Sequence, residues 1–574
     1  RPDMVKRLRS LGLLVKEEPL RHAVGVHDRC DTVDEPLVMK QWWMRMPPLA
    51  RPAIEAVRDG RVRIIPKHQE AVFFNWMENI RDWSIARQIW WGHPIPAWYC
   101  RDCQQVVVPE EDAPDPTRCP ACASSDIRQD PDVLDTWFSS ALWPHSTLGW
   151  PDRTRDLERY YPGSVLETGY DILFFWVARM IMMGLENMGD VPFHTVYVHG
   201  LVRTGGEKMS KSRGNVISPV GLIEEHGADA LRFALVSGVA AGADSQLAEA
   251  KLVNARNFAN KLWNVGRFVL RQIDARPAAL RGAPIDRPPA GAPGEAERWI
   301  LSRTAAIVEE ASRLLETYLF SEYVALLQSF VWGELADTYL ELAKPGLRDG
   351  ARADGVVRTL AHVLDRALRL LHPIMPFVTE TLALQLWRRG GLADVTPSLV
   401  VASWPTPRAR DRSLEERFTL ALDVVRAIRG LRQDAGLAPT QRVQVSLAGE
   451  VGALRERLAD IAALSNADVV VGPGRGSFAV VGKTEVHVST IGHADAAARF
   501  TLTTREAEAA RLNAELAEAR DALRRSLEVL AQPGFADRAP QPVIEKERDR
   551  RAQREERLRL LEEQIRLLSN SPDR

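Results

Sequence analysis

Hydrophobic residues follow two different spacings along the earlier part of the chain. Between about residues 31 and 245, short runs rich in β-branched residues alternate with helical patterns, which favours an α/β domain. From about 250 to 385, apolar residues recur every three or four positions, as on the buried face of a helix, for example at Phe258, Leu262, Val265 and Val269. The chain is therefore predicted to place an α/β domain before a helical bundle.

The last part of the chain carries two further patterns. Alternating apolar and polar residues at 442–447 and 486–489 predict strands of a small α+β module. Beyond about residue 502 the pattern is helical, with close to heptad spacing at Leu512, Leu516, Ala519 and Leu523 and again at Leu558, Leu561, Ile565 and Leu568. Because prolines interrupt this pattern between the two sets, we expect two helices that fold back as an antiparallel coiled coil.

A helix start is recognisable at Ser218 and Pro219, near the end of the α/β region. Ser218 suits the cap position, and Pro219 suits the first helical position, where its missing N–H would have had no partner in any case. The apolar positions that follow predict that this helix continues through Leu222 and Ile223 to Phe233.

The amino-acid composition is compatible with many classes of multidomain protein. A chain of 574 residues with 45% hydrophobic residues can build about three to five domains. No apolar run is long enough to span a bilayer, so no membrane partner is expected. The net charge of −1 neither supports nor excludes a nucleic-acid partner. Because the chain starts at Arg1 with neither Met nor a secretory signal, we expect a piece of a longer cytoplasmic protein.

Four of the five cysteines form two tight pairs. Cys100 and Cys103 are separated by two residues, as are Cys119 and Cys122, and fifteen residues lie between the pairs. This spacing is typical of a structural Zn²⁺ site with four thiolate ligands and no open position. Four reduced thiols without a metal are the alternative. Cys30 has no partner pair, and we expect a small buried residue there.

Tryptophans and arginines alternate in the stretch from 75 to 92. Such a mixture is compatible with a surface that binds single-stranded nucleic acid. It is equally compatible with tryptophans in the core and arginines at its border, and both interpretations stay open.

The stretch Lys208-Met209-Ser210-Lys211-Ser212 follows a β-branched run and lies in a glycine-rich loop. Lysine ammonium groups there can offset the negative charge of a polyphosphate without rigid geometry. The loop does not match the phosphate-binding loop of ordinary NTPases. A solvated turn with incidental lysines is the alternative.

Two other stretches, 132–142 and 167–176, each place a tryptophan beside carboxylates. The tryptophans are Trp137 and Trp176, and the second stretch adds Gly169, where a ligand could approach the backbone. Apolar walls with a few fixed polar groups suit a small-molecule pocket. Taken singly, each stretch is as compatible with a core segment.

Together these motifs resemble the class I aminoacyl-tRNA synthetases, and within them the valine-specific family. The likeness covers nearly the whole chain, most closely at 75–100, 132–151, 161–183 and 192–235. The stretches 136–144 and 168–176 favour the valine-specific family over its isoleucine-specific relative.

The resemblance implies a ligase that joins valine to ATP and passes the valyl group to tRNA(Val). By position, Trp137, Ile172 and Trp176 match the valine pocket. The ATP and adenylate positions are Gly169, Asp171, His199, Gly200 and Lys211, and Lys208 with Lys211 match the catalytic lysine loop. Magnesium is expected to accompany ATP, and Zn²⁺ to be structural at Cys100, Cys103, Cys119 and Cys122.

The implied fold is a multidomain one, α/β plus α. Its parts are the tail of an editing insertion at 1–30, a Rossmann-type catalytic core at 31–245 with a zinc knuckle at 98–126, a helical anticodon-binding domain at 246–405, a small α+β module at 406–500 and a coiled-coil tRNA-binding arm at 501–574. A cytoplasmic monomer is expected.

The chain departs from the family pattern in one important respect. The first class I motif, H-x-G-H, does not occur in it. We therefore expect the chain alone to activate valine poorly or not at all, and to be unable to edit threonine, which an apolar pocket cannot strongly reject. Two alternatives stay open: an isoleucine-specific enzyme, and a non-catalytic tRNA-binding protein derived from a synthetase.

Overall fold

The computed structural model describes residues 2–27, 30–110, 113–204, 207–208, 218–281, 285, 287–289, 294–390, 397–438, 440–474, 477–490, 505–531 and 541–570. The chain divides into two compact units, the first made of Arg1–Ser218 with Ala240–Gln246, and the second of Pro219–Val239 with Leu247–Arg574. Among the described residues, no helix combines the length and the apolar character that crossing a bilayer requires.

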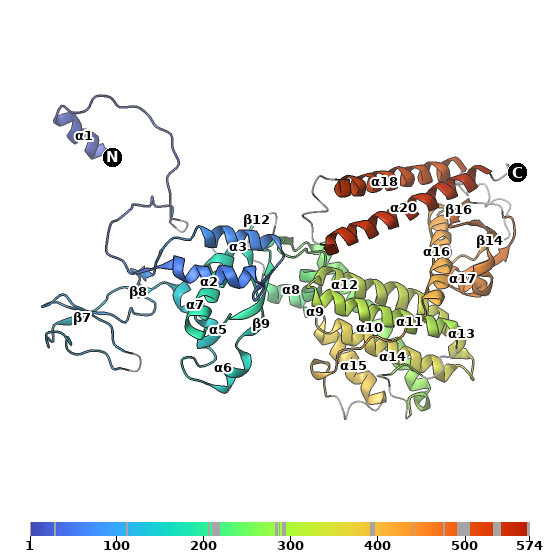
Figure 1. Ribbon diagram of the computed structural model, residues 1–574. Coiled ribbons are helices and arrows are strands. Elements are labelled where there is room, and N and C mark those ends of the chain that lie inside the picture. The colour runs from blue at the N-terminus through green and yellow to red at the C-terminus, as the bar shows by residue number, and fades with distance from the viewer. Residues whose placement is uncertain are drawn as a thin grey trace. The chain divides into compact units, whose positions relative to one another are not determined.

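The first unit is a mixture of short strands and helices (Figure 1). Its elements are α1 (Pro2–Ser10), β1 (Trp43–Met44), α2 (Met46–Arg58), β2 (Arg63–Ile65), α3 (His68–Glu78), β3 (Trp83–Ser84), β4 (Ala86–Arg87), β5 (Trp98–Cys100), β6 (Val106–Val107), β7 (Ile127–Gln129), β8 (Val133–Leu134), α4 (Thr136–Ala141), α5 (Trp143–Ser146), α6 (Arg155–Tyr160), β9 (Gly163–Gly169), η1 (Tyr170–Ile172), η2 (Leu173–Ala178), α7 (Arg179–Met188), β10 (Phe193–His199), β11 (Val202–Thr204), β12 (Glu207–Lys208) and β13 (Ser245–Gln246).

A parallel sheet with the order β2-β10-β9 forms the centre of this unit. Val196 and Val198 of β10 are fully buried, as expected for a parallel strand with apolar groups packed around it. The same core contains Ala53 of α2, Phe73 of α3 and Ile181 of α7. The predicted α/β class is therefore confirmed for this part of the chain.

The second unit is mainly helical. Its elements are α8 (Pro219–His226), α9 (Ala228–Val236), α10 (Glu249–Ala275), η4 (Pro277–Leu280), α11 (Glu295–Glu316), α12 (Phe320–Ser329), η5 (Phe330–Tyr339), α13 (Leu340–Arg348), α14 (Ala353–Leu371), α15 (Pro376–Gly390), η6 (Leu399–Val401), α16 (Arg412–Asp434), β14 (Val443–Gly449), η7 (Gly452–Arg457), α17 (Leu458–Ser465), β15 (Ala467–Val471), β16 (Ser477–Val481), β17 (Thr484–Thr490), α18 (Arg505–Ala531) and α20 (Gln541–Asn570).

Large buried side chains hold the helical bundle together. Phe258 of α10, Tyr323 of α12 and Trp387 of α15 are fully buried in one continuous core. The positions whose spacing predicted the bundle all belong to this core, and the helical prediction is confirmed.

The single helix predicted from Pro219 to Phe233 is wrong. The helix does begin at Pro219, but α8 ends at His226 and α9 begins at Ala228. Gly227 between them has φ 91°, a left-handed conformation that glycine adopts without steric strain. The apolar spacing continues across this break, which is why it did not reveal the change of direction.

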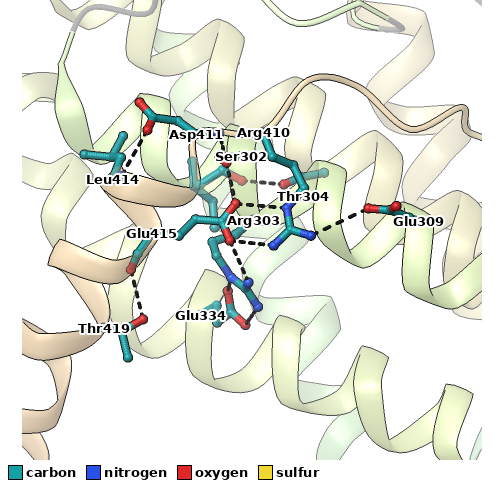
Figure 2. A network of polar contacts seen from close by, with 11 residues as sticks. Ser302, Arg303, Thr304, Glu309, Glu334, Arg410, Asp411, Leu414, Glu415 and Thr419 are labelled. Atoms are coloured by element: carbon teal, nitrogen blue, oxygen red, sulfur yellow. Dashed lines mark hydrogen bonds and ion pairs between the residues drawn. The ribbon is translucent and has the colours of Figure 1, made fainter. Parts of the chain in front are cut away.

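One buried carboxylate joins α16 to the bundle (Figure 2). Glu415, in the first turn of α16, accepts hydrogen bonds from Arg410 at 2.8 Å, from Arg303 of α11 at 3.2 Å and from the Ser302 hydroxyl. Arg303 in turn donates to Glu334 of η5 at 2.7 Å. Burial raises the pKa of Glu415, but the hydrogen bonds from Arg410 and Ser302 outweigh it and lower the pKa to about 2.

A four-stranded sheet with the order β15-β14-β17-β16 follows α16. Strand β14 is parallel to β15 and antiparallel to β17, as in an α+β arrangement. Both runs predicted as strands are strands in the structure.

The two terminal helices, red in Figure 1, run antiparallel. Arg557 of α20 contacts Glu515 of α18 at 3.2 Å, whereas Glu547, ten residues earlier, accepts from Ser526, which lies later in α18. Leu512, Leu516 and Leu561 are buried with Val480 of β16 in one apolar cluster. The antiparallel pairing is as predicted; the supercoil stays a prediction.

Replacing Glu415 with Gln should destabilise the contact between α16 and the bundle. We expect the variant to lower the free energy of unfolding by roughly 2–3 kcal/mol at pH 7, because Arg303 and Arg410 lose a charged acceptor. Faster hydrogen exchange in peptides covering Arg412–Asp434 would report the change.

The effect should depend on pH in a defined window. Since the pKa of Glu415 lies below its ordinary value of 4.5, its contribution is complete above pH 4.5 and disappears as the pH falls towards about 2. The difference between wild type and variant in urea midpoint should shrink accordingly. The exposed neighbour Glu416, changed to Gln, is the matched control and should show no such effect. An equal loss in both variants would contradict the assignment.

Candidate active site

The carboxyl ends of two parallel strands meet at one edge of the central sheet. Gly169 ends β9, His199 ends β10, and the two residues are direct partners in the ladder. Ligands of open α/β sheets bind at the carboxyl ends of the strands, where the chain turns away and leaves backbone groups accessible. The predicted residues Gly169, Asp171, His199 and Gly200 are therefore brought together at a suitable edge.

Close backbone packing at this edge requires glycine at position 200, whereas position 169 is close only to a side chain that can move. A Cβ atom at Gly169 would lie 2.7 Å from Asp171 Oδ1, and one at Gly200 would lie 2.0 Å from the carbonyl oxygen of Ala243. His199 is held at one ring nitrogen, since Nδ1 donates to the Gly200 carbonyl at 2.6 Å. Its Nε2 lies 3.2 Å from Glu167, a contact that is an ion pair when the ring is protonated. The imidazole is half exposed, and the hydrogen bond to Gly200 restrains it.

A second buried carboxylate positions the tryptophan of α4. Asp135 is the N-cap residue of α4, and its Oδ1 accepts from the backbone N–H of Trp137 at 2.9 Å. Its Oδ2 accepts from the indole N–H of Trp83 at 3.2 Å and from the guanidinium of Arg87. One side chain thus connects the start of α4 with β3 and β4.

The two tryptophans predicted to line the valine pocket belong to neighbouring elements that hold each other. Trp137 stacks on Phe175 of η2 with ring centroids 5.8 Å apart. Trp176, the next residue, donates from its indole N–H to the carbonyl of Ser140 in α4 at 3.0 Å. Ile172 ends η1 directly before η2 and is partly buried. The element η2 is a π-helix, a rare form that is frequent at functional sites.

Arg179 is a feature of this region that the sequence analysis missed. Its guanidinium is buried and lies 3.7 Å from the ring centroid of Trp83, with Phe174 and Phe175 also near it. Burial lowers the pKa of Arg179 to about 10, although Asp135 counteracts this effect. The side chain remains charged at neutral pH, held by aromatic faces. Its sequence neighbours are all apolar, so no local pattern marks it.

The predicted lysine loop is described only at its base. Strand β12, Glu207–Lys208, pairs with β11, and β11 also pairs with β13. Asp244 fixes this ribbon: it accepts from the N–H of Leu201 at 2.8 Å and from Arg203 at 2.6 Å. These donors, first the Leu201 N–H, lower the pKa of Asp244. The side chain of Lys208 and all of Lys211 lie outside the described residues.

The four paired cysteines come together in two turns of the same form. Gln104 N–H donates to the Cys100 carbonyl at 3.0 Å, and Ala123 N–H donates to the Cys119 carbonyl at 2.8 Å. Gln104 and Ala123 both have positive φ, 63° and 59°.

The turns bring the thiol groups within reach of a single ion. All four Sγ atoms lie within 4.8 Å of one another, and the contacts across the two turns are 3.5 and 3.6 Å. Four sulfurs bound to one Zn²⁺ at about 2.3 Å would be about 3.8 Å apart, so the donor set fits this ion.

Two expectations need revision. Cys30, predicted to be buried, is exposed, and its thiol donates to the hydroxyl of Thr32. The tryptophans of 75–92 do not share one environment: Trp83 is buried, whereas Trp90 and Trp91 are exposed. The core interpretation is thus confirmed for Trp83 and wrong for Trp90 and Trp91.

Comparison with known protein families covers most of the chain. Residues 24–248 match the profile of tRNA synthetases class I (I, L, M and V). Residues 297–447 match the anticodon-binding domain of tRNA ligase, and residues 506–569 match the valyl tRNA synthetase tRNA binding arm. The α/β part and the helical part therefore correspond to a class I catalytic domain and a helical anticodon-binding domain.

Individual relatives agree with these profiles. A valine–tRNA ligase of Dehalococcoides mccartyi is 47% identical over 558 residues, which cover 96% of this chain and 61% of the relative. One from Clostridium perfringens is 42% identical over 583 residues, covering 99% of this chain and 64% of the relative. The chain thus spans less than two thirds of the length of these relatives.

Among solved structures, the chain is similar to Mycobacterium tuberculosis methionyl-tRNA synthetase in complex with methionyl-adenylate. The TM-score is 0.49 at 19% identity, covering 67% of this chain and 71% of that one.

Asp135→Asn should loosen α4 and its tryptophan. The amide still caps the helix but no longer balances Arg87 and Arg179, so we expect a loss of roughly 3 kcal/mol in the stability of this region. Hydrogen exchange in peptides covering Thr136–Ala141 should accelerate. Asp152→Asn, at an exposed position, is the control and should leave exchange unchanged. If the two variants behaved alike, Asp135 would not organise the site.

Proposed function

The chain is related along almost its whole length to class I valine–tRNA ligases, and we propose that the protein activates valine with ATP and transfers it to tRNA(Val). The observation that carries this proposal is the ladder pair Gly169–His199 at the carboxyl edge of the parallel sheet. It supplies a half-exposed imidazole beside a glycine, whose lack of a side chain lets a ligand approach the backbone.

The reaction has two displacements. The carboxylate oxygen of valine attacks the α-phosphorus of ATP, the bond to the bridging oxygen breaks, and pyrophosphate leaves. A ribose hydroxyl of the tRNA terminus then attacks the carbonyl carbon of the valyl-adenylate, loses its proton, and AMP leaves. Neither displacement requires a nucleophile from the protein, so positioning and charge supply the rate enhancement.

The ATP and adenylate contacts are assigned to the sheet edge. His199 and Gly200 face the adenine side, and Gly169 with Asp171 lies by the adenylate. The restrained ring of His199 supports this assignment, because a fixed edge binds a planar base without further ordering. Magnesium accompanies ATP and offsets the charge of its phosphate oxygens when bound.

The lysine loop acts on the leaving group. We assign Lys208 and Lys211 to the charge that develops on the departing pyrophosphate. The anchoring of β11 by Asp244 supports a stable base for this loop, since the ribbon that carries Lys208 is held at Leu201 and Arg203. Stabilisation of charge that develops only in the transition state raises kcat more than affinity.

The valine slot is assigned to Trp137, Ile172 and Trp176. Two indole rings and a branched aliphatic side chain offer apolar walls for a branched substrate. The reciprocal contacts between α4 and η2 support a slot of fixed width, because neither tryptophan can turn without disturbing the other element.

Zn²⁺ is proposed at Cys100, Cys103, Cys119 and Cys122. The two equivalent turns and the sulfur separations support a closed site in which the ion ties β5, β6 and β7 together. The ion supplies structural stability and has no open position for a substrate.

The domain plan expected from the sequence is retained as part of the proposal. It comprises an editing-insertion tail at 1–30, a Rossmann-type core at 31–245 with the zinc knuckle at 98–126, an anticodon-binding domain at 246–405, an α+β module at 406–500 and a coiled-coil tRNA-binding arm at 501–574. We also retain the expectation that the protein is a monomer in the cytoplasm, where tRNA is available to it.

Valine-dependent exchange of pyrophosphate into ATP, measured on the protein as its gene encodes it, tests the proposal. Valine should support exchange and isoleucine much less, and valylated tRNA(Val) should form when tRNA is added. A protein that binds tRNA(Val) without any exchange would be a non-catalytic relative, and preference for isoleucine would identify the other enzyme.

Lys211→Ala should slow exchange roughly 100-fold with little change in the valine concentration for half-maximal rate, because the lysine acts on transition-state charge. Steady-state exchange kinetics give both parameters. Lys40→Ala, at an exposed lysine outside the proposed site, serves as the control. Loss of tRNA binding alone in the Lys211 variant would contradict the assignment.

Cys119→Ser should lower the zinc content by one ion per chain, because three thiolates and a hydroxyl hold the ion poorly. Elemental analysis of the dialysed protein measures this directly. Cys30→Ser removes an exposed thiol outside the cluster and should leave the zinc content unchanged. Equal zinc content in wild type and Cys119→Ser would exclude the site.

A further inference from the structure

A histidine and two glutamates meet where α8 ends and α10 begins. His226 is the last residue of α8, and its Nε2 lies 3.3 Å from Glu249 Oε1 at the start of α10 and 3.8 Å from Glu225 Oε2. The three ligand atoms all lie within 4.8 Å of one another. Both helices belong to the second unit, whereas the residues assigned to the valine site belong to the first.

Hydrogen bonding does not account for the position of this imidazole. The His226 side chain is 1% exposed, and neither ring nitrogen has a hydrogen-bond partner within the described part of the chain. A buried imidazole without hydrogen bonds is unfavourable, and the Nε2 atom is directed at two carboxylates. A cation held between them would satisfy both the imidazole and the carboxylates. The glutamates themselves are 66% and 67% exposed, which leaves the cluster open on one side.

We propose that His226, Glu225 and Glu249 bind one Zn²⁺ ion. Ligand bonds of about 2.0–2.2 Å in a tetrahedron place the ligand atoms about 3.3–3.6 Å apart, close to the 3.3 and 3.8 Å of this cluster. The exposed carboxylates need to move only slightly to complete the geometry. The fourth position faces solvent and is filled by water.

The donor set selects the type of ion. One imidazole nitrogen with two carboxylates suits zinc, whereas magnesium and calcium prefer sites made of oxygen alone. The second nitrogen of His226 lacks the acceptor that commonly supports a zinc-bound histidine, so this site should be about 10–100-fold weaker than a supported one.

The site would have a structural consequence. Glu225 and His226 lie directly before the left-handed Gly227, where the chain turns from α8 into α9. An ion shared with Glu249 would fasten this turn to the first residue of the long helix α10. It would also fix the helix that follows the lysine loop in the sequence, since Pro219 stands eight positions after Lys211.

Zinc binding to the whole chain tests this proposal. Equilibrium dialysis against buffered zinc should show one more ion bound to the wild type than to the double variant Glu225→Gln, Glu249→Gln. Glu224→Gln, an exposed glutamate on the same helix, should keep the wild-type number. Because the comparison is a difference between variants, it holds whether or not the cysteine cluster also binds zinc.

A second measurement covers stability. Zinc at a concentration ten times the measured Kd should raise the thermal midpoint of the wild type and of Glu224→Gln more than that of the double variant. The substituted glutamates are exposed, and far-ultraviolet circular dichroism should show an unchanged helix content. Identical zinc stoichiometry in wild type and double variant would overturn the proposal, as would an identical zinc-induced shift.

Discussion

The carboxylate of Asp135 is the interaction on which the candidate site depends. It accepts from Trp83, from Arg87 and from the first turn of α4, three groups contributed by separate short elements. Two-residue strands such as β3 and β4 have little stability of their own. The buried carboxylate compensates for this weakness, because the indole N–H of Trp83 and the N–H of Trp137 would lose their acceptor without it. The position of Trp137, and through Phe175 that of Trp176, follows from this one side chain.

The edge of the parallel sheet is completed by residues 240–246, and no local sequence pattern predicts that this segment packs there. Residues 240–246 come back to the first unit after α8 and α9 have joined the second. They bring the carbonyl of Ala243 against Gly200 and the carboxylate of Asp244 beneath β11. The glycine is required at this point because a backbone passes where a side chain would stand. The base of the lysine loop is therefore set by residues some forty positions away.

The sequence predicts well the elements that follow from the regular spacing of apolar residues or of cysteines. The helical bundle, the strands of the α+β module and the two cysteine turns follow from local repeats that determine local geometry. The partners of single polar side chains do not follow, because they are chosen by tertiary packing. Trp83 and Trp90 stand in the same mixed stretch, yet one is buried over Arg179 and the other is exposed. The break at Gly227 and the π-helix η2 were missed for a related reason: both preserve the apolar spacing on either side.

Each unit contains a buried carboxylate that faces two arginines, but the net charge around it differs in sign between the units. In the helical unit Glu415 lies between Arg303 and Arg410, and these arginines also contact Glu334 and Glu309, so acids outnumber bases in the network. In the α/β unit Asp135 faces both Arg87 and Arg179, so the bases outnumber the acid. In the first arrangement each arginine contacts two carboxylates, which suits a joint between helices. The second leaves an excess of positive charge in the aromatic region around α4 and η2. Under the proposed function, such an excess would attract a substrate that carries phosphate. A carboxylate facing two guanidiniums therefore occurs in both units, with a net negative charge around it in one and a net positive charge in the other.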